Sequence, residues 1–228
     1  MIASPLRIDA SPVARVDLAA IVANVRAEAA ARPLVDLRAD AFGHGTGTVA
    51  AALLEGTDAH LLVDDVDAGV DLPRHRLAMA ADERPCEAGA VYGLGHGVPA
   101  MTLIGTVLGV KILRAGEGVS YGYLHRASAD TRIALVTGGY AQGVVRSLGG
   151  QARVRIGPGL FPIVGRVAMD VCVVDIGDAR VVRGAPAVFF GDPGRGDPAV
   201  AQWAAATGLT AEEIVTAVGV HVRREYSR

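Results

Sequence analysis

A few side chains able to hold charge or move a proton stand out in an otherwise apolar chain. Arg38 follows an apolar run, Tyr121 lies in the turn-like segment VSYGY, and Asp170 ends the segment VAMD. A guanidinium can bind a carboxylate or a phosphate, and a phenol can act as a base at neutral pH when a cation lies nearby. We therefore take Tyr121, Arg38 and Asp170 as the candidate catalytic residues.

Each of these residues also has a structural interpretation, which stays open. Arg38 has three possible carboxylate partners, Asp36, Asp40 and Asp64. Tyr121 could pack beside Tyr123 at a turn, and Asp170 could end a strand and bind backbone amides. His44, in the segment GHG, could be a loop histidine that bonds the backbone. A buried charge needs a partner, so the retained cation at Arg38 remains informative under either interpretation.

The bulk composition excludes several classes of protein. The 228 residues carry a formal net charge of -2, which predicts no nucleic-acid or anionic-membrane surface. No apolar run reaches the ~18 residues of a membrane helix, and Met1–Ala10 lacks the apolar core of a signal peptide. Cys86 and Cys172 form no zinc motif, so we expect no metal and a reduced, cytoplasmic setting. The glycine-rich GDPGRGD lacks the lysine of a phosphate loop and predicts a turn.

The first third of the chain alternates between strand and helix patterns. The predicted helices are Asp17–Ala31, Thr48–Leu54 and Val66–Leu72, and the predicted strands are Pro33–Phe42, His60–Val63 and Leu77–Ala81. This alternation indicates βαβ units with a parallel sheet. The glycine- and proline-rich stretch Ala81–Pro99 has the composition of a linker.

The rest of the chain is mostly β in pattern. The predicted strands are Met101–Ile112, Thr131–Thr137, Ala152–Ile156, Val164–Ile176 and Ala187–Phe190. Their spacing is typical of a small barrel or sandwich. Two helices follow, Ala199–Thr207 and Ala211–Val218, with Asp197 and Thr210 as the predicted N-caps. The tail His221–Tyr226 is predicted to return to a sheet.

Five segments resemble the alanine racemase family, and they occur in the family's order. They are DLRADAFGHG from Asp36, PAMTLIGTV from Pro99, AGEGVSYG from Ala115, GYAQG from Gly139 and PIVGRVAMD from Pro162. The resemblance implies an eight-stranded α/β barrel followed by a β-domain, with an active site shared between two subunits. A complete barrel takes roughly 200 residues or more, so this chain has room for about three βα units.

The expected fold class is therefore α/β plus β, a partial (β/α) barrel followed by an alanine-racemase-type β-domain. The expected domains are residues 1–82 for the barrel remnant, 83–98 for a linker and 99–228 for the β-domain. The unclosed sheet needs cover, which favours a homodimer with its site at the subunit interface.

The resemblance also implies that the family's pyridoxal-phosphate site is altered. Arg38 stands where the family has its Schiff-base lysine, and a guanidinium cannot form that imine. Phe42 and Glu212 stand where the family has two phosphate-binding tyrosines. The arginine that pairs with the pyridine nitrogen belongs to the missing part of the barrel. We therefore expect no cofactor.

Other family positions are retained. Tyr121 matches the family's second catalytic base, and Met169 with Asp170 matches a Met-Asp pair beside the substrate carboxylate. His44 belongs to the barrel motif, and His125 is a second titratable residue near Tyr121. The expected substrate-binding residues are Phe42, His44, Met169, His125 and Glu212.

Three functions remain open at this point. The first is a cofactor-independent isomerase or cyclase that acts on an apolar intermediate of secondary metabolism in the vacated pocket. The second is a non-catalytic dimeric binding or scaffold protein. The third is residual pyridoxal-phosphate racemisation, which would require Lys111, the only lysine of the chain.

Overall fold

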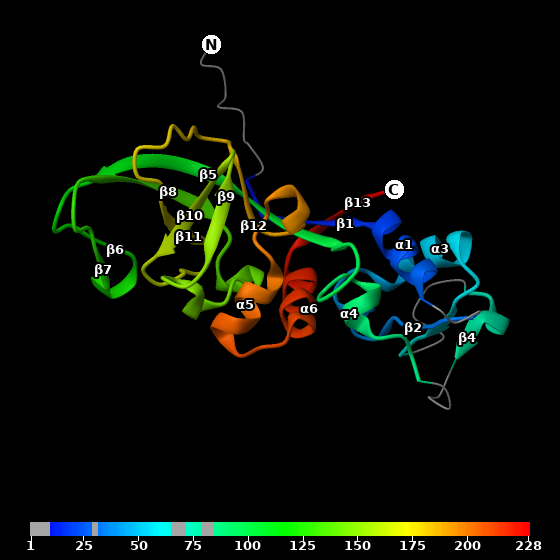
Figure 1. Ribbon diagram of the computed structural model, residues 1–228. Helices are drawn as coiled ribbons and strands as arrows, with labels where there is room; N and C mark the ends of the chain where they lie inside the picture. The colour runs from blue at the N-terminus through cyan, green and yellow to red at the C-terminus, as the bar shows by residue number, and fades with distance from the viewer. Residues whose placement is uncertain (1–9, 29–31, 65–71, 79–83) are drawn as a thin grey trace, which may run out of the picture. The chain divides into compact units, whose positions relative to one another are not determined.

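The computed structural model describes residues 10–28, 32–64, 72–78 and 84–228 (Figure 1). Contacts between residues divide the chain into two compact units. The sheet unit is Ile104–Phe189 together with the residues up to Pro12, and the helical unit is Val13–Leu103 together with Phe190–Arg228. The contacts therefore place Phe190–Arg228 in the same unit as the expected barrel segment. The expected domain boundaries at residues 82 and 98 remain a prediction.

The helical unit contains the expected βα elements. Its parallel sheet has the order β2 (Leu34–Asp36), β3 (His60–Leu62) and β4 (Leu77–Ala78). Helix α3 (Thr46–Gly56) connects β2 to β3 and packs against α1 (Leu18–Ala27). Together with the β-rich second unit, these elements confirm the predicted fold class. The helix predicted at Val66–Leu72 and the end of the strand predicted at Leu77–Ala81 lie outside the described residues.

Helix α1 begins where the sequence indicates. The Asp17 carboxylate accepts a hydrogen bond from the Ala20 amide at 3.0 Å, which confirms Asp17 as the N-cap. The helix ends at Ala27, earlier than the predicted Ala31. In the last turn of α1, the Arg26 Nε donates to the Gly56 carbonyl of α3 at 2.8 Å, which links the two helices.

The predicted linker covers an edge of the parallel sheet. The Cys86 amide donates to the Leu34 carbonyl of β2, and the Tyr92 hydroxyl donates to the Asp36 carbonyl, each at 2.8 Å. Between them lies a short helix, α4 (Ala88–Val91), which the linker interpretation did not anticipate. Two backbone acceptors on the free side of β2 are therefore satisfied by the chain itself.

A parallel strand pair and two helices complete the helical unit. Strand β1 (Val13–Asp17), which the sequence did not indicate, pairs in parallel with β13 (Arg223–Ser227). Helix α5 (Val200–Thr207) begins after Ala199, so the predicted Asp197 cap is wrong. The Asp197 carboxylate instead accepts the Asp192 amide at 3.1 Å.

Helix α6 (Ala211–His221) has the predicted Thr210 cap. The Thr210 hydroxyl accepts the Glu213 amide at 3.2 Å, and the Glu213 carboxylate accepts the Thr210 amide at 2.7 Å. This reciprocal pair is a capping box, which fixes the start of the helix.

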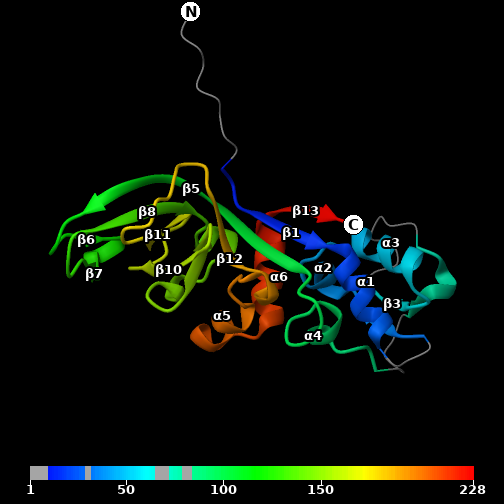
Figure 2. The ribbon, with the colours of Figure 1, turned by 45° about the horizontal axis from the view of Figure 1, so that its top comes forward.

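The sheet unit is a closed antiparallel sheet (Figures 1 and 2). Its strand order is β12 (Pro186–Phe190), β9 (Arg153–Ile156), β10 (Gly159–Val164), β11 (Val171–Asp175), β8 (Thr131–Thr137) and β5 (Met101–Leu113), and β12 also pairs with β5. The prediction of a single strand over Val164–Ile176 is wrong. Gly165, with φ +67, turns the chain between β10 and β11.

A small hairpin extends from this sheet. It consists of β6 (Gly118–Val119) and β7 (His125–Arg126), joined by the helical turn η2 (Tyr121–Tyr123). Other single helical turns are η1 (Arg74–Arg76), η3 (Tyr140–Gln142), η4 (Arg146–Leu148) and η5 (Pro193–Arg195). Turn η5 confirms that GDPGRGD forms a turn, in which the Asp192 carboxylate accepts the Gly194 amide at 2.8 Å.

Across the described ranges, the search for a helix with the length and apolarity to span a bilayer finds none.

Candidate functional site

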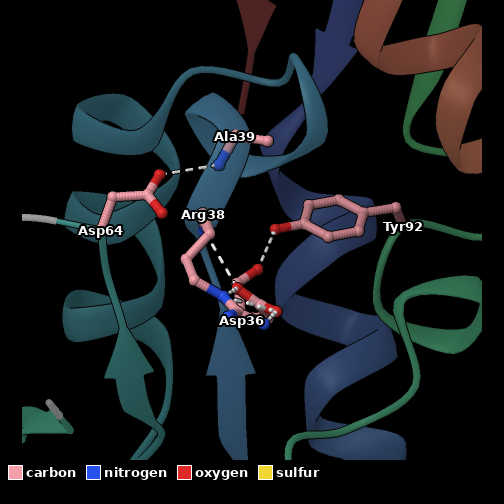
Figure 3. A network of polar contacts seen from close by, with 5 residues as sticks. All are labelled: Asp36, Arg38, Ala39, Asp64 and Tyr92. Atoms are coloured by element: carbon pink, nitrogen blue, oxygen red, sulfur yellow. Dashed lines mark hydrogen bonds and ion pairs between the residues drawn. The ribbon is translucent and has the colours of Figure 1, made fainter. Parts of the chain in front are cut away.

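Arg38 emerges at the end of β2 and binds the carboxylate of Asp36 (Figure 3). The Arg38 Nε lies 2.9 Å from Asp36 Oδ1 and its Nη2 lies 2.6 Å from Oδ2. The Arg38 amide also donates to Oδ1 at 3.0 Å. Of the three aspartates open as partners, the structure therefore selects Asp36. Two parallel N–H···O bonds make this a two-point ion pair.

The ion pair is only partly shielded from solvent. Burial acts to raise the pKa of Asp36, but the hydrogen bonds and charge of Arg38 outweigh it and hold that pKa below its usual value. The Arg38 side chain is 51% exposed, whereas the Asp36 side chain is 10% exposed. The Arg38 Nη1 makes no hydrogen bond to a described residue, so this edge of the guanidinium is open to an anion.

The residues after Arg38 form a left-handed turn, α2 (Arg38–Phe42), instead of continuing the strand predicted at Pro33–Phe42. Ala39, Asp40, Ala41 and Phe42 have φ between 52 and 57°. Each such L-residue costs about 1–2 kcal/mol relative to the right-handed region. A local preference therefore cannot explain this turn, and tertiary contacts must hold it.

Two side chains from distant positions, together with Asp40 of the turn itself, supply those contacts. The Asp64 carboxylate, beyond β3, accepts the Ala39 amide at 2.9 Å. Arg224 of β13 forms a short ion pair with Asp40 and donates to the Gly43 carbonyl at 3.1 Å. Asp40 also accepts the Thr46 amide at 2.9 Å. Sequence reasoning did not select Arg224, which is distant in the chain from its partner.

His44 is a buried histidine that bonds backbone, as its structural interpretation predicted. Its Nδ1 lies 3.0 Å from the Ala41 carbonyl and 3.1 Å from the Phe42 carbonyl, so this nitrogen must carry the proton. The ring stacks on Tyr92 with centroids 4.5 Å apart. Burial lowers the pKa of His44 to about 4, so the ring is neutral at physiological pH.

Helix α6 packs on this left-handed turn. A Cβ placed on Gly219 would meet the Gly43 carbonyl oxygen at 1.9 Å, which shows how closely the two backbones approach. Phe42 is half-buried against Tyr92, with ring centroids 5.5 Å apart. Glu212 lies in the first turn of α6, and its Oε1 is 4.0 Å from the Cβ position of Gly89.

In the sheet unit, Tyr121 projects from the hairpin. Its side chain is 75% exposed. Ser120, Gly122 and Tyr123 have φ +64, +79 and +49, so two residues other than glycine lie in the left-handed region at this turn. The Arg146 guanidinium lies 5.8 Å from the centroid of the Tyr121 ring and 5.8 Å from that of Tyr140. Sequence reasoning missed Arg146.

Asp170 lies just before β11 and is linked to η3. The Gln142 Nε2 donates to Asp170 Oδ1 at 3.1 Å, and the Gln142 Oε1 accepts the Gly139 amide at 2.9 Å. Met169 is exposed, and His125 is half-buried in β7. The expected hydrogen bond from the Asp170 carboxylate to Arg166 or to a backbone amide does not form among the described residues.

The predicted site residues thus form two groups, one in each unit. Arg38, Phe42 and His44 lie on or beside the left-handed turn, with Glu212 on the helix that packs against it. In the other group, Arg146 lies near the rings of Tyr121 and Tyr140. Gln142, in the same helical turn as Tyr140, binds Asp170.

Comparison with known proteins decides the ancestry of the chain. The family model for the C-terminal domain of alanine racemase matches residues 100–226. The chain belongs to the alanine racemase family. The alanine racemase of Mycobacterium avium is 38% identical over 212 residues, which cover 89% of this chain and 53% of that protein. That of Streptomyces coelicolor is 40% identical over 162 residues, 70% of this chain and 41% of that protein.

This member of the alanine racemase family spans about half the length, or less, of the curated relatives it matches. Solved structures share its fold. The alanine racemase of Streptomyces lavendulae has a TM-score of 0.83 at 22% identity, covering 97% of this chain and 98% of that one. The enzyme of Bartonella henselae, with covalently bound pyridoxal phosphate, has a TM-score of 0.77 at 16% identity, covering 96% and 100%.

Proposed function

We propose that this alanine racemase family member does not use pyridoxal phosphate and acts as a cofactor-independent isomerase or cyclase on a small apolar molecule. We further propose that it works as a homodimer with its site at the subunit interface. The observation that carries the proposal is the two-point ion pair of Arg38 with Asp36, at the position where the family resemblance places the imine-forming lysine.

The side chains around the left-handed turn do not fit the phosphate cofactor. Arg38 has no free amine, and its guanidinium is already bound to a carboxylate. Phe42 has no hydroxyl to offer a phosphate, and Glu212 would place a negative charge near one. The only lysine, Lys111, lies in β5, in a different unit from Arg38.

The remaining polar groups suit proton-transfer chemistry that needs no cofactor. Tyr121 is exposed, and the Arg146 guanidinium lies 5.8 Å from the centroid of its ring, so a cation stands beside this side chain. The open edge of Arg38 could bind a substrate carbonyl or carboxylate. Asp170, fixed by Gln142, could orient the substrate. A site of this kind can also promote a cyclisation mainly by holding the reactive conformer.

A second candidate function, non-catalytic binding, is favoured by the same ion pair. Asp36 already neutralises much of the Arg38 charge, which lowers the reactivity expected of a catalytic cation. A binding protein would retain the pocket and the dimer without turnover. The two candidates differ in whether loss of Tyr121 abolishes a reaction.

A trapping experiment tests the cofactor claim. Lys111 is the only side-chain amine that this sequence offers to pyridoxal phosphate. Incubation with the cofactor, borohydride reduction and peptide mass spectrometry should show no stoichiometric adduct, and L-alanine in D2O should keep its α-proton. Stoichiometric labelling of Lys111 together with α-proton exchange, both lost in Lys111→Arg, would establish residual racemisation and overturn the proposal.

A turnover experiment separates enzyme from binder. The intermediates made by enzymes encoded beside this gene are incubated with the protein in D2O and followed by NMR. We expect conversion of one of them, reduced at least about a hundredfold by Tyr121→Phe if this phenol is the general acid or base. Tyr123→Phe, which removes the hydroxyl of another tyrosine of the turn η2, is the matched control. Binding without conversion would favour the second candidate.

A further inference from the structure

A hollow of about 560 Å³ lies wholly within the sheet unit. Strands β5, β8 and β11 form its floor, and the hairpin segment from Gly118 to Tyr123 forms a wall. Small-molecule sites are commonly concave, about 300–1,000 Å³ in volume, and mostly apolar with a few polar groups. This hollow has those properties, and neither Arg38 nor Tyr121 lines it.

Strand register explains why the floor is apolar. Gly109 lies opposite Leu135, and Leu135 lies opposite Val173, so these three side-chain positions form one row across the sheet. Leu135 is 40% exposed, whereas its neighbours Ala134 and Val136 point to the other face and are fully buried. The floor is therefore an apolar sheet face that the described residues leave partly open to solvent.

The next row brings a single cation to the floor. Lys111 lies opposite Ile133, and Ile133 lies opposite Asp175. The Asp175 carboxylate is occupied by the Thr131 hydroxyl at 2.6 Å and the Gly177 amide at 3.0 Å. Lys111 itself makes no ion pair or hydrogen bond with a described residue. Its ammonium group is therefore available to an anion in the hollow.

Two hydroxyl groups complete the lining. Ser120 Oγ accepts the Arg166 amide at 2.9 Å, which leaves its own hydrogen free to donate. Tyr123 is 66% exposed, and its hydroxyl makes no hydrogen bond to the described part of the chain. The hollow thus offers one positive charge and two O–H donors, and no carboxylate belongs to its lining.

Gly109, which follows an irregularity of β5, contributes no side chain to the hollow. The register between β5 and β8 shifts between Val107 and Gly109, and bulges and similar irregularities are frequent beside functional sites. A Cβ added at Gly109 would meet nothing within 4 Å. A larger side chain at this position would therefore project into open space without displacing the fold.

We propose that this hollow is a binding site for a small amphiphilic anion, an aliphatic carboxylate whose tail lies on Leu135 and Val173 and whose head pairs with Lys111. The apolar rows set the preference for a tail, and the unpaired ammonium with two hydroxyl donors sets the preference for an anionic acceptor. The site is independent of the function proposed for Arg38 and Tyr121.

Titration calorimetry with decanoate, decanol and decylammonium tests the site on the full chain. Decanoate should bind at least about tenfold more tightly than decanol, and decylammonium should bind most weakly. Lys111→Ala should reduce the decanoate affinity to that of decanol, whereas Arg183→Ala, which removes an exposed cation outside the lining, should leave it unchanged. Amide shifts in labelled protein should map to Gly109 and Gly118.

A pocket-filling variant provides the second arm. Gly109→Ile should weaken decanoate and decanol alike, whereas Gly95→Ile, at another glycine with open surroundings, should weaken neither. Equal decanoate affinity in wild type, Lys111→Ala and Gly109→Ile would overturn the proposal. A dimer dissociated by Gly109→Ile, with no decanoate binding to wild type, would instead identify this face as an interface between copies and would also overturn it.

Discussion

Arg38 and Asp36, two residues apart at the end of β2, bind each other through two guanidinium nitrogens and both carboxylate oxygens, at 2.9 and 2.6 Å. This geometry predicts that Arg38→Lys will not restore the family's imine. A carboxylate beside the new amine stabilises its ammonium form, which is not a nucleophile. Borohydride trapping with pyridoxal phosphate should give no adduct on the peptide that contains position 38.

The double variant Asp36→Val with Arg38→Lys provides the control for this prediction. Removing the carboxylate frees the amine, so adduct formation should rise above that of Arg38→Lys. Efficient labelling of the single variant, equal to that of the double variant, would contradict the role given to Asp36.

A shared site predicts complementation between two inactive variants. If each site takes Arg38 from one subunit and Tyr121 from the other, a mixed dimer of Arg38→Ala and Tyr121→Phe contains one intact site and one doubly altered site. Random mixing makes half the dimers mixed, so activity should recover to about a quarter of wild type. The measurement is turnover after unfolding and refolding the two variants together. No recovery, although mixed dimers form, would place both residues in the same subunit's site.

The left-handed turn predicts opposite effects for the same substitution at two exposed alanines. Ala39 has φ +53, where glycine relieves strain, so Ala39→Gly should stabilise the fold by about 0.5–1 kcal/mol. Ala51 lies on the exposed face of α3, so Ala51→Gly should destabilise it by about 1 kcal/mol. Urea unfolding of both variants measures the two free-energy changes. A loss of stability in both would show that the turn at Ala39 is not left-handed.

His44 predicts a loss of stability in acid. Burial lowers its pKa to about 4 in the folded chain, whereas an unfolded histidine has a pKa of about 6.5. The unfolded chain therefore binds more protons between these values, and stability falls as pH falls through that window. From about pH 7 to about pH 5 the loss attributable to His44 should be about 2 kcal/mol.

His44→Asn isolates this effect, because the asparagine amide nitrogen stands near the position of Nδ1, can donate to the Ala41 and Phe42 carbonyls and does not titrate. Urea unfolding across the pH range should show a shallower slope for the variant than for wild type. Identical slopes would mean that His44 is not buried in its neutral form.

Much of the fold was predictable because local signals decide it. The caps at Asp17 and Thr210 follow from side-chain chemistry within a few residues, and the strand at Thr131–Thr137 follows from its β-branched run. One failure arose from a local signal that the overall composition of the segment outweighed. Val164–Ile176 has the composition of one strand, but Gly165 turns it into two.

The candidate site shows a different limit. The sequence indicated Arg38 and three aspartates near it, and the structure selects Asp36 among them. It could not indicate that Arg224 pairs with Asp40, because 184 residues separate them, nor that the apolar segment after Arg38 winds left-handed. Arg146 was missed because nothing in its neighbourhood along the chain points to Tyr121.

The parallel pairing of β1 with β13 has a consequence for the order in which the chain matures on the ribosome. Val13 is among the first described residues to be synthesised, and its partner Arg223 is among the last. The same late strand carries Arg224, which holds the turn at Asp40. The helical unit therefore cannot complete its structure until β13 has been synthesised. Strand β1 can therefore pair with β13 only after Arg223–Ser227 have been synthesised.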